Sequence, residues 1–167
     1  GIFKNLVNLQ TLVLSTNQLS SFRGDEFDDL RSLTALFLEH NSISSLPVGI
    51  FKDLVNLKVL GLHHDSLSSL PAGIFKDKVN LQSLFLENNQ ITSLPVDIFK
   101  DQRNLQTLTL QQNRFTLSED LCSFVFVLPL SASATNGYVK VDQNVLNYVT
   151  NNLIQVDLSI LHITRTR

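Results

Sequence analysis

The sequence of 167 residues contains a single cysteine, Cys122, so no disulfide can form within the chain. We therefore expect no disulfide-bonded cap within these 167 residues. No Asn-x-Ser/Thr sequon occurs, so another mark of a secreted protein is missing. The six glycines form no phosphate-cradling loop. Cys122 itself lies in an apolar run, where we expect a buried structural thiol rather than a reactive one.

Long hydrophobic runs and a large excess of one charge are also missing. The apolar segment 121–130 has about half of the roughly 20 residues that a membrane-spanning helix needs, and Pro129 interrupts it. The formal net charge of -2 gives no reason to expect nucleic acid or an anionic membrane as a partner. We therefore expect no nucleic-acid binding, and no membrane insertion by this segment.

What the sequence has instead is one pattern at a fixed spacing. Five copies of Leu-x-x-Leu-x-Leu begin 24 positions apart, at Leu9, Leu33, Leu57, Leu81 and Leu105. A strict period of this length predicts a solenoid, in which each repeat buries its hydrophobic face against its neighbours. A hydrophobic content of 43% is ample for the continuous core of such a fold.

A polar position follows each predicted strand. Asparagine fills it in four copies, at Asn17, Asn41, Asn89 and Asn113. An inward asparagine can pair backbone N–H and C=O groups of neighbouring turns that would otherwise be buried without partners. Asp65 takes this position in the remaining copy. Because a carboxylate accepts but does not donate hydrogen bonds, we expect Asp65 either to make a weaker contact or to turn outward toward His63 or His64.

A phenylalanine recurs with the same period on the other side of each repeat. This column comprises Phe3, Phe27, Phe51, Phe75 and Phe99. We expect the rings to stack along the convex side of the solenoid and to help set its curvature.

The full pattern, Leu-x-x-Leu-x-Leu-x-x-Asn-x-Leu, resembles the leucine-rich repeat over residues 1–118. Residues 70–77 (Leu-Pro-Ala-Gly-Ile-Phe-Lys-Asp) and 94–101 (Leu-Pro-Val-Asp-Ile-Phe-Lys-Asp) are most similar to variable lymphocyte receptors of jawless vertebrates. Toll-like receptor ectodomains and Slit-type proteins are near relatives of that typical extracellular subclass. The resemblance implies an α/β solenoid, a right-handed superhelix with a parallel concave β-sheet and an irregular or short helical convex side.

The same resemblance implies a binding role. We expect a recognition module that is part of an immune or adhesion receptor, in an extracellular or cell-surface location that the cysteine count does not itself support. The ligand is not implied, because this scaffold carries many different binding functions.

The two ends of the chain differ from the regular repeats. Residues 1–4 (Gly-Ile-Phe-Lys) match residues 49–52, so we expect the sequence to begin within a repeat of a longer protein. Residues 119–167 depart from the consensus, and we expect degenerate terminal repeats or a C-terminal capping region there. We expect this segment to keep the phase of the repeats, which puts the next copies at 129–134 and 153–158.

Function is expected on the concave sheet, where the strand residues between the leucines point outward. Parallel strands lie about 4.8 Å apart, so residues 24 positions apart become neighbours on this face. The candidate ligand-binding residues are Phe37, Glu39, His40, His63, His64, Phe85 and Glu87. We predict that the two rings flank a gap left open by Gly61. We also predict that the flanking carboxylates raise the pKa of His63, which would make binding pH-sensitive near neutrality.

Three interpretations of this surface stay open. Exposed aromatic rings beside polar groups are typical of protein-binding sites, so we favour a protein or peptide ligand and expect no cofactor. The second interpretation is a structural repeat fragment with no ligand of its own. The third is a divalent metal site in which His63 joins one of the two glutamates and a neighbouring histidine.

Two further motifs are interpreted as non-functional. Residues 63–65, His-His-Asp, are of catalytic types, yet no nucleophile is tied to them by spacing and an open sheet does not exclude water, so we expect no enzyme. Residues 23–25, Arg-Gly-Asp, spell a motif that integrins recognise. Because Phe22 and Phe27 should both be drawn inward, we expect this tripeptide to be held against the solenoid wall and interpret it as a coincidence.

Overall fold

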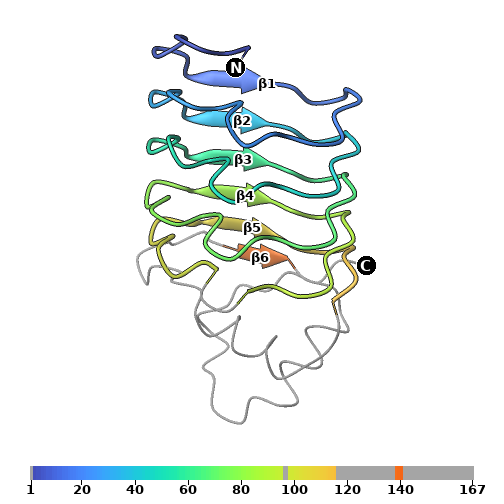
Figure 1. The fold of residues 1–167 in the computed structure, drawn as a ribbon. Helices are drawn as coiled ribbons and strands as arrows, with labels where there is room; N and C mark the ends of the chain where they lie inside the picture. The colour runs from blue at the N-terminus through green and yellow to red at the C-terminus, as the bar shows by residue number, and fades with distance from the viewer. Residues whose placement is uncertain (1, 96–97, 116–137, 141–167) are drawn as a thin grey trace.

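In a computed structural model, six short parallel strands of the described residues form one sheet, and their order in the sheet is their order in the sequence (Figure 1). The structure describes residues 2–95, 98–115 and 138–140. The strands are β1 (Thr11–Val13), β2 (Ala35–Phe37), β3 (Val59–Gly61), β4 (Ser83–Phe85), β5 (Thr107–Thr109) and β6 (Tyr138–Lys140). From β1 to β5, the chain makes one turn of a coil for each strand.

The register between the first five strands repeats with the period of the sequence pattern. Leu36 in β2, for example, pairs with Leu12 on one side and with Leu60 on the other. This confirms the predicted leucine-rich-repeat solenoid with its parallel concave sheet. In the described residues, the segments that return between the strands form turns rather than helices, so the convex side has the irregular form.

The inward leucines of the strands form the centre of the core. The fully buried members of this column are Leu36, Leu60, Leu84 and Leu108. Truncating one such side chain to alanine removes buried apolar surface and leaves a cavity, which costs about 2–5 kcal/mol. Leu12, in the edge strand β1, is only partly buried.

The asparagine column links each repeat to the one before it. Asn89 accepts a hydrogen bond from the Leu67 N–H at 2.9 Å and donates to the carbonyl oxygen of Leu62 at 2.7 Å. Asn41 and Asn113 make the equivalent pairs of contacts. The predicted inward role of the asparagine is confirmed at these three positions.

Asp65 also faces inward, at the asparagine position of its repeat. Its Oδ1 accepts a hydrogen bond from the Ile43 N–H at 3.0 Å, whereas its buried Oδ2 has no hydrogen-bond partner. The alternative in which Asp65 turns outward toward His63 or His64 is therefore wrong. Burial raises the pKa of Asp65 to about 6, and the hydrogen bond from Ile43 offsets only part of that effect.

The predicted column of phenylalanine rings is present behind the sheet. The ring centroids of Phe27 and Phe51 lie 6.3 Å apart with an interplanar angle of 14°, and those of Phe75 and Phe99 lie 5.8 Å apart at 10°. All four rings are buried. Stacked rings of successive repeats therefore fill the space behind the leucines, where they add to the apolar area removed from water.

A second asparagine column, which the sequence analysis missed, lies in the turns that precede the strands. Asn56, Asn80 and Asn104 each donate to the carbonyl oxygen 25 residues earlier, at 2.8, 3.1 and 2.7 Å. These bonds satisfy carbonyl groups of the preceding repeat. The three residues share the period of 24, so the spacing itself could have identified them.

Strand β6 does not keep this period. Thr107 of β5 pairs with Tyr138, which is 31 positions further along the chain. The expectation that the C-terminal segment keeps the phase of the repeats is therefore wrong at this strand. Most of 119–167, including Cys122, lies outside the described residues, so a boundary at residue 118 stays a prediction.

Asp65→Asn should stabilise the fold by about 1–2 kcal/mol near neutral pH, because the amide can donate to carbonyl groups as the other asparagines do. The raised pKa sets the sign of the pH dependence. The contribution of Asp65 to stability is full below its unfolded pKa of 3.8 and is lost as the pH rises through about 6.

Urea unfolding of the two proteins on either side of this pH window measures the effect. The gain should be large above the window and small below it. Asp25→Asn removes one exposed carboxylate elsewhere and serves as the control. Destabilisation by Asp65→Asn above the window would contradict this account.

Candidate functional site

The candidate residues lie where β2, β3 and β4 end. Phe37 and Phe85 are the last residues of β2 and β4, and each pairs with Gly61, the last residue of β3. The turns after these strands carry the other candidates, Glu39, His40, His63, His64 and Glu87. The register brings all seven onto three adjacent repeats, and they are called the concave patch below. His40 and His64 are exposed, and the other five are partly buried.

The space above Gly61 is occupied by the side chain of Glu39. A Cβ atom added to Gly61 would overlap Glu39 Oε2 and would lie 3.4 Å from Phe37 Cδ1. The prediction that glycine leaves an open gap between the two rings is therefore wrong. The missing side chain instead makes room for a carboxylate from the neighbouring repeat.

His40 and His64 form a stacked pair along the edge of the patch. Their ring centroids are 4.4 Å apart with an interplanar angle of 10°. Both residues have a positive φ, 56° and 55°, which is uncommon for residues other than glycine. Residues at the same position in the other repeats share this conformation: Thr16, Asn88 and Gln112. The repeated backbone geometry therefore places the two imidazoles in parallel.

His63 lies at the centre of the patch. Its ring packs edge to face with the rings of His40 and His64, at centroid distances of 5.6 and 5.5 Å. A third contact of the same kind, at 5.9 Å, joins it to Phe85. Its Nδ1 atom is buried and has no hydrogen-bond partner. The imidazole is thus held mainly by ring contacts rather than by polar ones.

Burial lowers the pKa of His63 below its usual value of 6.5, because the surrounding groups exclude water from the charged form. The carboxylates of Glu87 and Glu39 act in the opposite direction, and the charges of His64 and His40 add to the lowering. The prediction of a raised pKa is therefore wrong, since desolvation outweighs the two carboxylates. His63 is uncharged at neutral pH, and its protonation belongs to the acidic range.

The two carboxylates of the patch differ in their partners. Glu87 Oε2 accepts a hydrogen bond from the hydroxyl of Thr109 in β5. Glu39 Oε2 is buried above Gly61 without a partner, and the buried Oε1 of Gln111 also lacks one. Thr109 and Gln111 were not among the candidates. Thr109 is 24 positions after Phe85, and Gln111 is 24 positions after Glu87, so the period could have identified both.

The metal-site interpretation finds no support in the geometry. Within residues 2–95, 98–115 and 138–140, no three His, Cys, Asp or Glu side chains converge in a way that could hold a metal ion. The three imidazoles of the patch meet through their ring faces and edges, as the stacked and edge-on contacts show.

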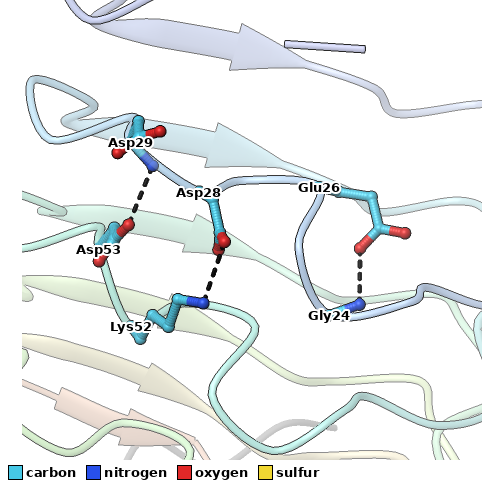
Figure 2. Close-up of polar contacts among 6 residues, drawn as sticks. All are labelled: Gly24, Glu26, Asp28, Asp29, Lys52 and Asp53. Atoms are coloured by element: carbon cyan, nitrogen blue, oxygen red, sulfur yellow. Dashed lines mark hydrogen bonds and ion pairs between the residues drawn. The ribbon is translucent and has the colours of Figure 1, made fainter. Parts of the chain in front are cut away.

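The backbone of the Arg-Gly-Asp segment is held by the side chain of Glu26. The Glu26 carboxylate accepts hydrogen bonds from the backbone N–H groups of Arg23 and Gly24, at 2.6 and 2.9 Å. Figure 2 shows the contact with Gly24. Phe27 is buried beneath this segment, and the partly buried ring of Phe22 packs against it at 5.6 Å. The expectation that both rings draw this segment against the solenoid is confirmed.

Charged side chains beside that segment connect its repeat to the next one (Figure 2). Lys52 Nζ lies 3.0 Å from Asp28 Oδ2, and Asp53 Oδ2 accepts a hydrogen bond from the Asp29 N–H at 3.0 Å. An exposed ion pair of this kind contributes about 0–1 kcal/mol. We interpret these contacts as structural.

Comparison with known proteins agrees with this architecture. The sequence model of the leucine rich repeat family matches residues 1–43, 38–91 and 79–123. The chain therefore belongs to the leucine-rich repeat family. A comparison with curated proteins gives no match.

Two solved structures illustrate the likeness. The leucine-rich repeat domain of APL1B is 28% identical with a TM-score of 0.69, over 84% of this chain and 40% of that one. The internalin InlF from Listeria monocytogenes is 28% identical with a TM-score of 0.59, over 83% of this chain and 36% of that one. The chain thus spans less than half the length of either protein.

The imidazole of His63 should titrate with a midpoint below pH 6.5, because burial outweighs its two carboxylate neighbours. Proton NMR of the imidazole signals measures this midpoint, and His63→Gln assigns the signal. A midpoint above 6.5 would contradict the account. Since the folded pKa is depressed, the stabilising contribution of neutral His63 is present above pH 6.5 and is lost as the pH falls through the folded value.

Proposed function

We propose that this chain is a recognition module whose concave patch binds a protein or peptide ligand. The observation that carries the proposal is the pair of partly exposed rings, Phe37 and Phe85, beside carboxylates and imidazoles on one sheet face. Aromatic anchors surrounded by polar groups are enriched among the residues that dominate binding energy in protein interfaces.

The scaffold favours this use of the patch. Its side chains extend from three paired strands and the turns that follow them, over a continuous buried core. Side chains that are already ordered lose less conformational entropy when a ligand binds. An open sheet face also suits a macromolecular surface, whereas small molecules are usually bound in enclosed pockets.

We further propose that the chain belongs to an immune or adhesion receptor in an extracellular or cell-surface location. The support is the likeness of residues 70–77 and 94–101 to variable lymphocyte receptors and Toll-like receptor ectodomains. No helix among the described residues is long and apolar enough to cross a membrane.

Binding accounts for the site better than catalysis does. In the His-His-Asp segment, Asp65 faces the core and accepts the N–H of Ile43. It is therefore not placed to orient His63, which is what a catalytic carboxylate must do for its histidine. The ring contacts of His63 are those of a packed side chain.

Selection from a random peptide display library should yield ligands that depend on Phe37 and Phe85. Each of Phe37→Ala and Phe85→Ala should weaken binding by about tenfold or more, because a buried aromatic anchor is lost. Calorimetric titration of a selected peptide measures the change. Val48→Ala is the matched control, since it trims an apolar side chain that is 77% exposed and lies away from the strands.

The competing interpretations give different outcomes in this experiment. Ligands that bind both phenylalanine variants as tightly as the parent protein would place recognition on another surface. A library that gives no ligand would favour a structural repeat fragment without a ligand of its own.

A further inference from the structure

We propose that the concave patch takes a basic side chain, arginine or lysine, from its partner. The cation lies over the carboxylate of Glu39, which fills the space above Gly61 between Phe37 and Phe85, and Glu39 and Glu87 are its counter-charges. This inference rests on the proposed function and adds the chemistry of the group that is recognised.

The patch contains a buried acceptor without a partner. Glu39 Oε2 lies above Gly61, is shielded from water and has no hydrogen-bond partner. A buried polar atom without a partner costs about 1–3 kcal/mol, and more when it carries a charge. An occupant that brings N–H donors removes this penalty.

The charged side chains of the patch are acidic. Glu39 and Glu87 are its acidic members, and it contains neither lysine nor arginine. Burial keeps His63 uncharged at neutral pH, against the opposing effect of the two carboxylates that face it. Lys58 is one residue before the start of β3, at the opposite end of the strands. The patch therefore attracts a positively charged group.

Two aromatic rings lie on either side of the carboxylate of Glu39. Phe37 and Phe85 stand on strands two apart, which places their backbones roughly 9.6 Å from each other. The faces of aromatic rings attract cations, and arginine is the commonest partner of this kind. The apolar stem of an arginine or lysine can pack against the rings while its head meets the carboxylates.

Other occupants fit less well. An apolar side chain would leave the carboxylate of Glu39 buried and unpaired, and the penalty would grow as the remaining water is displaced. An acidic side chain would meet two like charges at close range. Only a positively charged donor both bonds to Glu39 Oε2 and neutralises the negative charge of Glu39 and Glu87.

A pair of capped tripeptides tests the inference, one with arginine and one with citrulline, both flanked by glycines. Citrulline keeps the shape and most donors of arginine but is uncharged. Titration followed by backbone NMR should give saturable shifts at the ends of β2, β3 and β4 with the arginine peptide. The citrulline peptide should bind at least about tenfold more weakly, as expected when a charge-assisted contact becomes neutral. Equal affinities, or no saturable shift with the arginine peptide, would overturn the inference.

Three variants connect the effect to Glu39. Glu39→Gln keeps the size of the side chain but removes the charge, and it should weaken arginine binding by about tenfold. Gly61→Ala should also weaken it, because the new Cβ displaces the carboxylate, which is the mobile end of a flexible side chain. Asp25→Asn removes an exposed negative charge from a distant segment and should leave the affinity unchanged. Unchanged binding in Glu39→Gln would refute the assignment.

The selected peptides separate this inference from the proposed function. Ligands that need Phe37 and Phe85, contain arginine or lysine, and weaken with Glu39→Gln support both. Ligands that need the two rings but bind Glu39→Gln as tightly as the parent chain would leave the recognition function in place. They would overturn the inference that the patch binds a basic side chain.

Discussion

The fold depends on one constraint, which is that each residue meets its counterpart 24 positions away in the adjacent repeat. This register stacks the buried leucines of β2 to β5. It also aligns each inward asparagine with backbone groups of the repeat before it, as Asn89 shows with Leu62 and Leu67. Each repeat buries its apolar face against its neighbours, so much of the stability of the solenoid comes from the interfaces between repeats.

The same constraint builds the concave patch. Stacking places Phe37, Gly61 and Phe85 in one row, and the absence of a side chain at Gly61 lets Glu39 cross onto the neighbouring repeat. Burial is the main cause of the raised pKa of Asp65, and the charge of Glu39 adds to it. The third repeat thus departs from the consensus at Gly61 in its strand and at Asp65 in its asparagine column. Both residues lie close enough to the carboxylate of Glu39 to be affected by it.

Periodicity was sufficient to predict the solenoid, the inward leucines and the phenylalanine column. It also predicted which residues of adjacent repeats become neighbours in the concave patch, because all of these follow from spacing alone. It was insufficient where the outcome depends on a balance of energies. The lowered pKa of His63 is the result of desolvation by neighbouring groups, and spacing reveals its carboxylate neighbours but not its burial. The direction taken by Glu39 depends on rotamers that no sequence pattern specifies. The longer step from β5 to β6 lies where the repeats lose their consensus.

The central claim is that recognition takes place at the ends of β2, β3 and β4. Amide hydrogen exchange of the chain, with and without a bound ligand protein, tests this most directly. Protection on binding should concentrate in 37–40, 61–64 and 85–88. Protection confined to the turns of the convex side, with these three segments unchanged, would contradict the claim.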